Sequence, residues 1–312
     1  MHQRVSHKKP INAPTMQPAI ITLIFFNPAG FGIPVKSLTR KKMNNTLNCK
    51  NWSKSWSEDG FVCVRRAFND YFLQLLKLGV EKALKNPGAL SKEYAEKEKG
   101  RFFTDHHMRK RIPQFQRFLD ESPVAEIAGR IMNTKKLILF DEHLLVKEPG
   151  TENPTYWHQD LPYYELTGSQ VISLWIPLDP ISANSGAVSF IRGSHKWGKI
   201  FQPIRIGRGD LVNEADQFDG PAPDIEGAPE KYDIVTFDEM RPGDCLAFNA
   251  AVMHYAAPNV TLGTRRRALS VRFAGDDVTW QPRSYVPNVL DTPNLQPGDP
   301  LDSDEYPVVW RA

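Results

Sequence analysis

Short apolar stretches separated by turn-forming residues dominate the chain from Ser57 onward. They are rich in Val, Ile, Leu and Phe and are bounded by Gly, Pro, Asn and Asp, which is the pattern of β-strands. We predict strands at 61–64, 136–146, 170–178, 187–191, 245–253 and 267–273. Many short strands joined by tight turns favour a β-rich architecture over a helical bundle.

Two segments show helical spacing instead. Asn69 and Asp70 can cap a helix that Asn86-Pro87-Gly88 ends, and a second helix begins near Ser122-Pro123. The regular helix and strand alternation of parallel sheets is missing. We therefore predict a mainly β (α+β) fold for residues 43–312. It would be a single double-stranded β-helix domain, a cupin-like jelly roll with flanking N-terminal helices.

Composition agrees with one globular domain and excludes a cysteine-based framework. The chain has 312 residues, 41 % of them hydrophobic, with 25 prolines and 20 glycines that supply turns. Its three cysteines, Cys49, Cys63 and Cys245, are odd in number and lack the spacing of a thiolate zinc site. They indicate a reducing compartment, and we predict a cytoplasmic protein.

The net charge of +3 is unevenly distributed. Residues 1–50 hold eight basic and no acidic side chains, so the other residues carry 31 basic and 36 acidic side chains. We predict that residues 1–42 are a disordered basic extension and that the domain has no nucleic-acid partner. The apolar run 19–26 is too short to cross a bilayer, so no membrane partner is expected. Basic residues before that run leave a targeting signal as the alternative.

Met43 precedes the first segment with a domain-like pattern, so translation can begin naturally at that residue. We expect a chain lacking residues 1–42 to stay soluble and to match the full chain in activity. Thermal unfolding and turnover of the two proteins, measured side by side, check this. Loss of soluble protein on truncation would refute it.

Two further segments differ from the strand pattern. Residues 210–239 hold ten acidic side chains and one lysine among prolines and glycines, which indicates an acidic insertion between strands. The insertion is interpreted as a solvated surface loop, with a lid over the site as the alternative. Residues 277–312 are rich in proline and are expected to wrap the body as an extended tail.

The segment Pro154–Asp160 places His158 and Asp160 two residues apart on a predicted strand, where both side chains point to the same side. By itself this pair is a weak signal. His254 follows a second apolar strand and is a third candidate ligand, and its separation of 96 residues from His158 suits adjacent strands of a barrel. Two histidines and one carboxylate form the ligand set of non-heme Fe(II) oxygenases.

Other histidines are weaker candidates. His195 is an alternative ligand, but it follows a Gly-Ser turn and not an apolar strand end. His106 and His107 are adjacent, and neighbouring residues on a strand face opposite ways. We therefore place these two in a loop or in a supporting position around the site.

Several ordered motifs together resemble the phytanoyl-CoA dioxygenase family of Fe(II)- and 2-oxoglutarate-dependent oxygenases. The resemblance runs from about Asp59 to Asp277. It implies that His158, Asp160 and His254 bind iron, with 2-oxoglutarate and O2 as cosubstrates. The motifs are 146–150, 157–160, 174–178, 186–195, Gly243-Asp244 with His254, and 265–270.

The resemblance also implies an arginine for the far carboxylate of 2-oxoglutarate, which suits the planar fork of a guanidinium. Counting from the second histidine gives Arg265, whereas aligning on Ala268-Leu269-Ser270 gives Arg266. Strand register decides between them, and we favour Arg266. Lys147 and Trp175 match residues near the cosubstrate, and their plainer interpretations are a strand-end charge and a core aromatic.

One departure from the family concerns the residues after the second histidine. Tyr255-Ala256 stands where many members have Gly-Ser, so the serine hydroxyl that can reach the cosubstrate is missing. A contact made by that hydroxyl is therefore not expected here.

We expect an enzyme that hydroxylates an unactivated C–H bond of a small molecule and releases succinate and CO2. The Asp160 carboxylate blocks the place that chloride takes in related halogenases. Tyr163, Tyr164 and Glu165 are expected to line the pocket, but the sequence assigns neither substrate nor oligomeric state. The alternatives are a non-catalytic cupin-like metal- or ligand-binding module and, less favoured, a demethylase of nucleic acid or protein, which lacks the expected basic surface.

Overall fold

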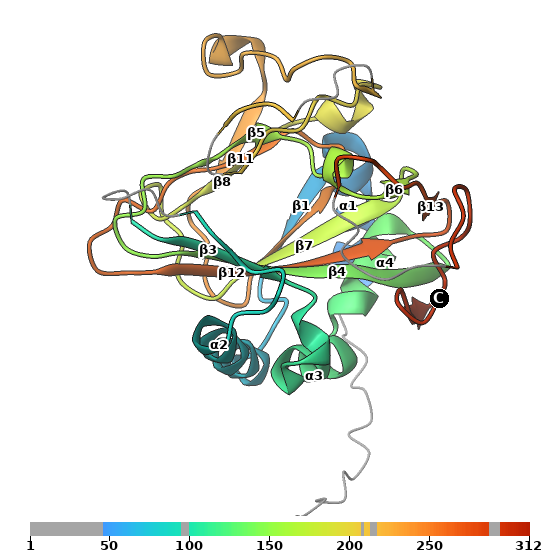
Figure 1. Ribbon diagram of the computed structural model, residues 1–312, viewed down its shortest axis with the longest axis horizontal. Helices are drawn as coiled ribbons and strands as arrows, with labels where there is room; N and C mark the ends of the chain where they lie inside the picture. The colour runs from blue at the N-terminus through green and yellow to red at the C-terminus, as the bar shows by residue number, and fades with distance from the viewer. Residues whose placement is uncertain (1–45, 95–99, 207–208, 213–216, 287–293) are drawn as a thin grey trace, which may run out of the picture. The chain divides into compact units, whose positions relative to one another are not determined.

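The computed structural model describes residues 46–94, 100–206, 209–212, 217–286 and 294–312. The predicted basic extension, 1–42, lies outside the described residues. Helices and strands occur throughout the described part (Figure 1). Its α-helices are α1 Thr46–Asp59, α2 Asp70–Lys85, α3 Pro113–Glu121 and α4 Val124–Met132. Its strands are β1 Phe61–Val64, β2 Lys92–Glu93, β3 Phe102–His106, β4 Lys136–Lys147, β5 Thr155–His158, β6 Leu166–Thr167, β7 Val171–Pro177, β8 Val188–Ile191, β9 Ile234–Phe237, β10 Cys245–Asn249, β11 His254–Ala256, β12 Arg266–Ala274, β13 Thr279–Trp280 and β14 Val308–Arg311.

Two antiparallel sheets form the body of the protein. The major sheet has eight strands in the order β1-β10-β7-β12-β4-β3-β2, with β14 also paired to β4. The minor sheet has four strands in the order β5-β11-β8-β9, and β13 and β6 form a separate pair. Neighbours in both sheets come from distant parts of the chain, as in a jelly roll. The predicted double-stranded β-helix fold is confirmed.

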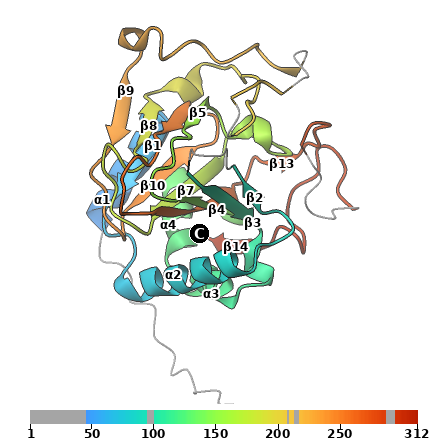
Figure 2. The ribbon, with the colours of Figure 1, turned by 60° about the vertical axis from the view of Figure 1, so that its left-hand side comes forward.

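The helices cover one face of the major sheet. Along β12 the side chains of Leu269, Val271 and Phe273 pack into the same apolar core as residues of all four helices. The alternate residues of β12 face the minor sheet, because side chains alternate across a strand. Figures 1 and 2 show α2 and α3 below the major sheet and β5, β8 and β11 above it. The side chains on this face of β12 can therefore contribute to a site between the two sheets.

The predicted helices match α2 and α4, whereas α1 and α3 were not predicted. Asn69 caps α2 by accepting a hydrogen bond from the backbone N–H of Phe72. The signal for α3 is Pro113 at its first turn, followed by Phe115, Phe118 and Leu119 at helical spacing, all of them buried. In α1 only a few apolar side chains stand among polar ones, so its pattern is weak.

Three regions have more regular structure than the sequence predicted. The segment around His106, expected as a loop or as a supporting position around the site, is strand β3 up to that residue. The acidic stretch 210–239 contains β9, which pairs with β8 and belongs to the minor sheet, and its residues 213–216 lie outside the described part. The extended tail after Asp277 forms β13 and β14. No described helix is long and apolar enough to cross a membrane.

Strand β4 contains a β-bulge that decides which of its side chains face the minor sheet. The pairing with β12 shifts by one residue between Arg272 and Phe273, at the level of Phe140. Before the bulge Leu137 and Leu139 pack on the helices, and after it Leu144 and Val146 do so. The bulge therefore turns Asp141, His143 and Leu145 toward the inside, as bulges near active sites often do.

The last strand completes the outer edge of β4. β14 pairs with residues 136–138 of β4, and β3 pairs with residues 143–147 along the same edge. The indole of Trp310 lies against Gly129 of α4 so closely that a Cβ added there would be 2.5 Å from the ring. β14 is thus held at the edge of the major sheet by its pairing with β4 and by its contact with α4.

Candidate active site

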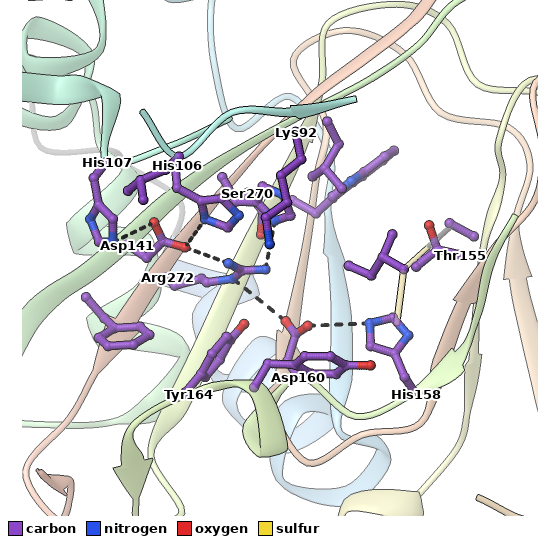
Figure 3. A pocket seen from close by; sticks show the side chains of 18 of the residues that line it. Lys92, His106, His107, Asp141, Thr155, His158, Asp160, Tyr164, Ser270 and Arg272 are labelled. Atoms are coloured by element: carbon purple, nitrogen blue, oxygen red, sulfur yellow. Dashed lines mark hydrogen bonds and ion pairs between the residues drawn. The ribbon is translucent and has the colours of Figure 1, made fainter. Parts of the chain in front are cut away.

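A cavity of about 350 Å³ lies between the two sheets and contains every metal-ligand candidate favoured from the sequence. His158, Asp160 and His254 line it from the minor-sheet side, and Arg266 and Arg272 line it from β12. Figure 3 shows His158 and Asp160 facing Arg272 in this cavity. The expected pocket residues Tyr163, Tyr164 and Glu165 also line it.

His158 and His254 face each other across two paired strands. They are directly opposite on β5 and β11, and their ring centroids are 4.1 Å apart. The Nδ1 of His158 is 2.7 Å from the Tyr156 carbonyl oxygen, and that of His254 is 3.1 Å from the Val252 carbonyl oxygen. A carbonyl can only accept, so each Nδ1 carries the proton and each Nε2 offers a lone pair.

His254 does not end the strand on which the sequence placed it. The apolar run breaks at Asn249, whose side chain accepts a hydrogen bond from the backbone N–H of Ala251. This local turn ends β10 and sends the chain into the minor sheet, where His254 begins β11. The prediction of a strand adjacent to that of His158 is nevertheless confirmed.

Asp160 lies beyond β5, so the prediction that it shares a strand with His158 is wrong. Its backbone is helical, and the next residue, Leu161, donates to the carbonyl of Ala250. This turn still brings Asp160 Oδ1 to 3.6 Å from the Nε2 of His158 and 3.8 Å from that of His254. The other oxygen accepts a hydrogen bond from Ser173 at 3.0 Å.

The three side chains are suited to a divalent metal ion. Their nearest donor atoms all lie within 4.8 Å of one another, and all three residues are buried. Burial, and then the nearby His158, lower the pKa of His254 to about 3, so its ring is neutral. Burial opposes ionisation of Asp160, but Arg272 and the two histidines outweigh it and hold its pKa well below the usual value. Two imidazoles and one carboxylate can hold Fe(II) and leave coordination positions open.

The other histidines take no part in this group. His195 donates a hydrogen bond from its Nε2 to the backbone carbonyl of Ser57 at 3.1 Å, and it does not line the cavity. His106 and His107 both line the cavity and both lie beside Asp141, because His107 has a left-handed backbone conformation with φ of 49°.

Arg266 is buried deep in the cavity with two nitrogens unpaired. Its Nε and one terminal nitrogen have no hydrogen-bond partner among the described residues, and only 1 % of the residue is exposed. Burial lowers its pKa to about 10, which still leaves it charged at neutral pH. The guanidinium carbon is 5.8 Å from the ring centre of Trp175. An unpaired buried cation in a cavity is a ready partner for a carboxylate ligand.

Arg265, the other arginine considered from the sequence, points outward. It forms ion pairs with Glu81 and Glu148, and 37 % of its side chain is exposed. Arg267, also outward, pairs with Asp179 and Glu81. The alternation along β12 therefore excludes Arg265 from the cavity and selects Arg266.

Lys147 stands opposite Arg266 on β4 but is already engaged. Its ammonium donates hydrogen bonds to the carbonyls of Ala256 and Ala257 and lies 5.0 Å from the ring centre of Phe102. Burial, followed by the charge of Arg266, lowers its pKa well below the usual value. Its visible role is to fix the end of β11, and it is not among the residues that line the cavity.

Gly186 allows the close approach of the Arg266 side chain. Its φ is +79°, and a Cβ added there would be 2.6 Å from the Arg266 Nε. We expect Gly186→Ala to displace the guanidinium and to weaken 2-oxoglutarate binding by about tenfold or more, since misplacement of a charged clamp loses most of its interaction. Calorimetric titration with 2-oxoglutarate checks this, and an unchanged affinity would contradict it.

Three cavity residues were missed by the sequence analysis, namely Asp141, His143 and Arg272. The Arg272 guanidinium donates to Asp141 Oδ2 at 2.6 Å and to His143 Nδ1 at 3.0 Å, and its Nε lies 3.9 Å from Asp160 Oδ2. Figure 3 shows this arginine between the two carboxylates. The available signal was a set of charged residues inside otherwise apolar strands.

Arg272 holds Asp160 in place through charge and position. We expect Arg272→Lys to lower iron affinity by about 10- to 100-fold, because a lysine cannot reach Asp141, His143 and Asp160 together. Iron titration of the variant measures this. Affinity equal to that of the wild type would show that Ser173 alone positions the carboxylate.

A family model described as phytanoyl-CoA dioxygenase (PhyH) matches residues 56–268, which is more than half of the chain. The chain belongs to the phytanoyl-CoA dioxygenase family. It is 22 % identical over 256 residues to a phytanoyl-CoA dioxygenase of Arabidopsis thaliana, covering 79 % of this chain and 83 % of the relative. It is 33 % identical over 119 residues to a 1-deoxypentalenic acid 11-beta-hydroxylase of Streptomyces exfoliatus, covering 36 % of this chain and 38 % of the relative.

Solved structures agree on the fold of this phytanoyl-CoA dioxygenase family member. SnoK, a non-heme alpha-ketoglutarate-dependent carbocyclase from nogalamycin biosynthesis, aligns with a TM-score of 0.66 at 22 % identity, covering 84 % of this chain and 96 % of SnoK. EctD from S. alaskensis, solved with 2-oxoglutarate and 5-hydroxyectoine, aligns with a TM-score of 0.58 at 17 % identity, covering 80 % and 84 %. As a family member, the chain is an Fe(II)- and 2-oxoglutarate-dependent oxygenase.

Proposed function

We propose that this oxygenase hydroxylates an unactivated C–H bond of a small molecule and releases succinate and CO2. His158, Asp160 and His254 would hold the iron, and Arg266 would hold the far carboxylate of 2-oxoglutarate. The observation that carries the proposal is the presence, in one cavity, of three convergent metal donors and a buried guanidinium without a partner.

Iron, together with 2-oxoglutarate and O2, supplies the oxidising chemistry when bound. The residues of the chain supply position and a dry environment. The backbone carbonyls of Tyr156 and Val252 keep each Nε2 free for the metal. Trp175 lies beside Arg266 and restricts its orientation.

A turnover assay tests this proposal. We expect the purified protein to release succinate from 2-oxoglutarate only when Fe(II) and O2 are both present, and to release more when a true substrate is added. No succinate release in the presence of Fe(II) and O2, or no 2-oxoglutarate binding at all, would favour a non-catalytic binding module. Mass analysis of the product distinguishes addition of one oxygen from other outcomes, which matters because SnoK is described as a carbocyclase and SnoN as an epimerase.

A small-molecule substrate suits the cavity, whose volume of about 350 Å³ lies in the range of ligand pockets. Cys63 and Cys245 are free thiols, which supports the proposed cytoplasmic location. Fractionation of the cells that produce the protein would test that location.

A further inference from the structure

Glu165 is a cavity carboxylate that has no partner within the described part of the chain. It lies between Tyr164 and β6, lines the cavity, and only 8 % of it is exposed. Its side chain makes no hydrogen bond or ion pair with any described residue, and burial raises its pKa to about 7. Neither carboxylate oxygen is fully enclosed by protein, so a ligand in the cavity can reach both of them.

The other acidic residues of the cavity wall are already paired. Asp141 is bonded to Arg272, and Asp160 lies within ion-pair distance of the same guanidinium. Glu165 is therefore the carboxylate left for a ligand among the described lining residues. It makes no contact with His158, His254 or Arg266 that would assign it to the metal or to 2-oxoglutarate.

The backbone around Glu165 is firmly held. Its own carbonyl accepts a hydrogen bond from the Gln281 N–H at 2.9 Å. Arg283 donates to the carbonyls of Tyr164 at 2.7 Å and Leu166 at 3.1 Å, the residues on either side. The nearby guanidinium thus fixes the main chain and leaves the Glu165 carboxylate unpaired.

Aromatic rings surround this part of the cavity. Phe140 stacks with Tyr306 at 5.5 Å between ring centres and meets Tyr164 at 5.1 Å. Tyr164 and Leu166, the two neighbours of Glu165, belong to the same apolar cluster as Tyr306, and Phe140 packs against that cluster. In agreement with this placement, burial and then the charge of Glu165 raise the pKa of the Tyr306 phenol. A carboxylate next to aromatic faces is a suitable environment for an organic cation, since both attract positive charge.

We infer that the substrate carries a positively charged amine nitrogen, which binds the Glu165 carboxylate beside Phe140 and Tyr306. This inference rests on the proposed function and names the substrate class of the same cavity. The ammonium group would anchor one end of the substrate and leave its reacting carbon toward His158, Asp160 and His254. Among the described residues, the cationic side chains that line the cavity do not pair with Glu165: Arg272 is bound to Asp141, and neither Arg266 nor Lys92 forms an ion pair with Glu165.

The test compares two probes of nearly equal shape. Phenethylammonium and 2-phenylethanol are titrated calorimetrically into the protein loaded with Fe(II) and 2-oxoglutarate under anaerobic conditions. We expect the ammonium probe to bind about tenfold more tightly or better, which is about 1.4 kcal/mol. In Glu165→Gln this preference should disappear, while in the control Glu239→Gln, an exposed carboxylate outside the cavity, it should persist.

Equal affinity for the two probes, no measurable binding of the ammonium probe, or a preference that survives Glu165→Gln would overturn the inference. Binding of 2-oxoglutarate by Glu165→Gln shows that the variant is folded. If the variant does not fold, the affinities of the wild-type protein for the two probes decide whether the inference holds. The same titrations without iron and 2-oxoglutarate separate the two proposals. A protein that prefers the ammonium probe but does not bind 2-oxoglutarate would contradict the proposed function and leave the role of Glu165 intact.

Discussion

Replacing Arg266 with alanine is expected to raise the dissociation constant of 2-oxoglutarate by about 100-fold or more. Removing one partner of a buried charge pair typically costs about 2 to 5 kcal/mol, and Arg266 has no other partner for its free nitrogens among the described residues. Succinate release at a fixed, low concentration of 2-oxoglutarate should fall in proportion. Calorimetric titration and the turnover assay measure the two effects.

The matched control is Arg265→Ala, which removes a guanidinium one residue away. Arg265 is exposed and paired with Glu81 and Glu148, so 2-oxoglutarate affinity should stay near that of the wild type. We expect the Arg266 variant to remain folded without ligands, since a buried cation without a partner contributes no net stabilisation. A larger loss of affinity in Arg265→Ala than in Arg266→Ala would reverse the assignment.

Replacing Asp160 with alanine is expected to abolish turnover and to weaken iron binding by at least about 100-fold. This residue supplies the single carboxylate of the three-donor group, and even residues that only orient a metal ligand typically cost 10- to 100-fold. Metal content after dialysis, together with succinate release, measures the loss. Retained turnover with bound iron would count against the metal centre.

His195→Ala serves as the control for the metal centre. His195 was the alternative ligand in the sequence, and its ring lies beside Gly60 and the carbonyl of Ser57, away from the cavity wall. Iron content and succinate release should be unchanged. If His195→Ala lost its iron while Asp160→Ala kept it, the metal centre would have to be assigned to His195 and not to Asp160.

The sequence predicted what local pattern and strand alternation control. Arg266 was favoured over Arg265 by aligning the family motif on Ala268-Leu269-Ser270 and by strand register, and the structure places only Arg266 inside. The pairing of His158 with His254 was expected from their distance along the chain and from the apolar strands that precede them. Motif spacing and strand pattern are both readable in a sequence.

The parts that were missed depend on tertiary contacts. Asp160 leaves its strand because the Leu161 N–H bonds to Ala250 from a distant segment. The bulge at Phe140 exists only in the pairing of β4 with β12, so the sequence of β4 did not reveal that Asp141 faces inward. Arg272 contacts both carboxylates, Asp141 after the bulge and Asp160 in the turn that follows β5. Its role therefore became visible only in the folded protein.

The position of β14 has a consequence for biosynthesis. The first residues of β4, 136–138, are covered on their outer edge by β14, although β4 itself is made much earlier. The nascent polypeptide keeps unpaired amides on that part of the edge until β14 has left the ribosome. Closure of the major sheet is consequently a late step of biosynthesis, and the interval before it is when chaperones have most to protect.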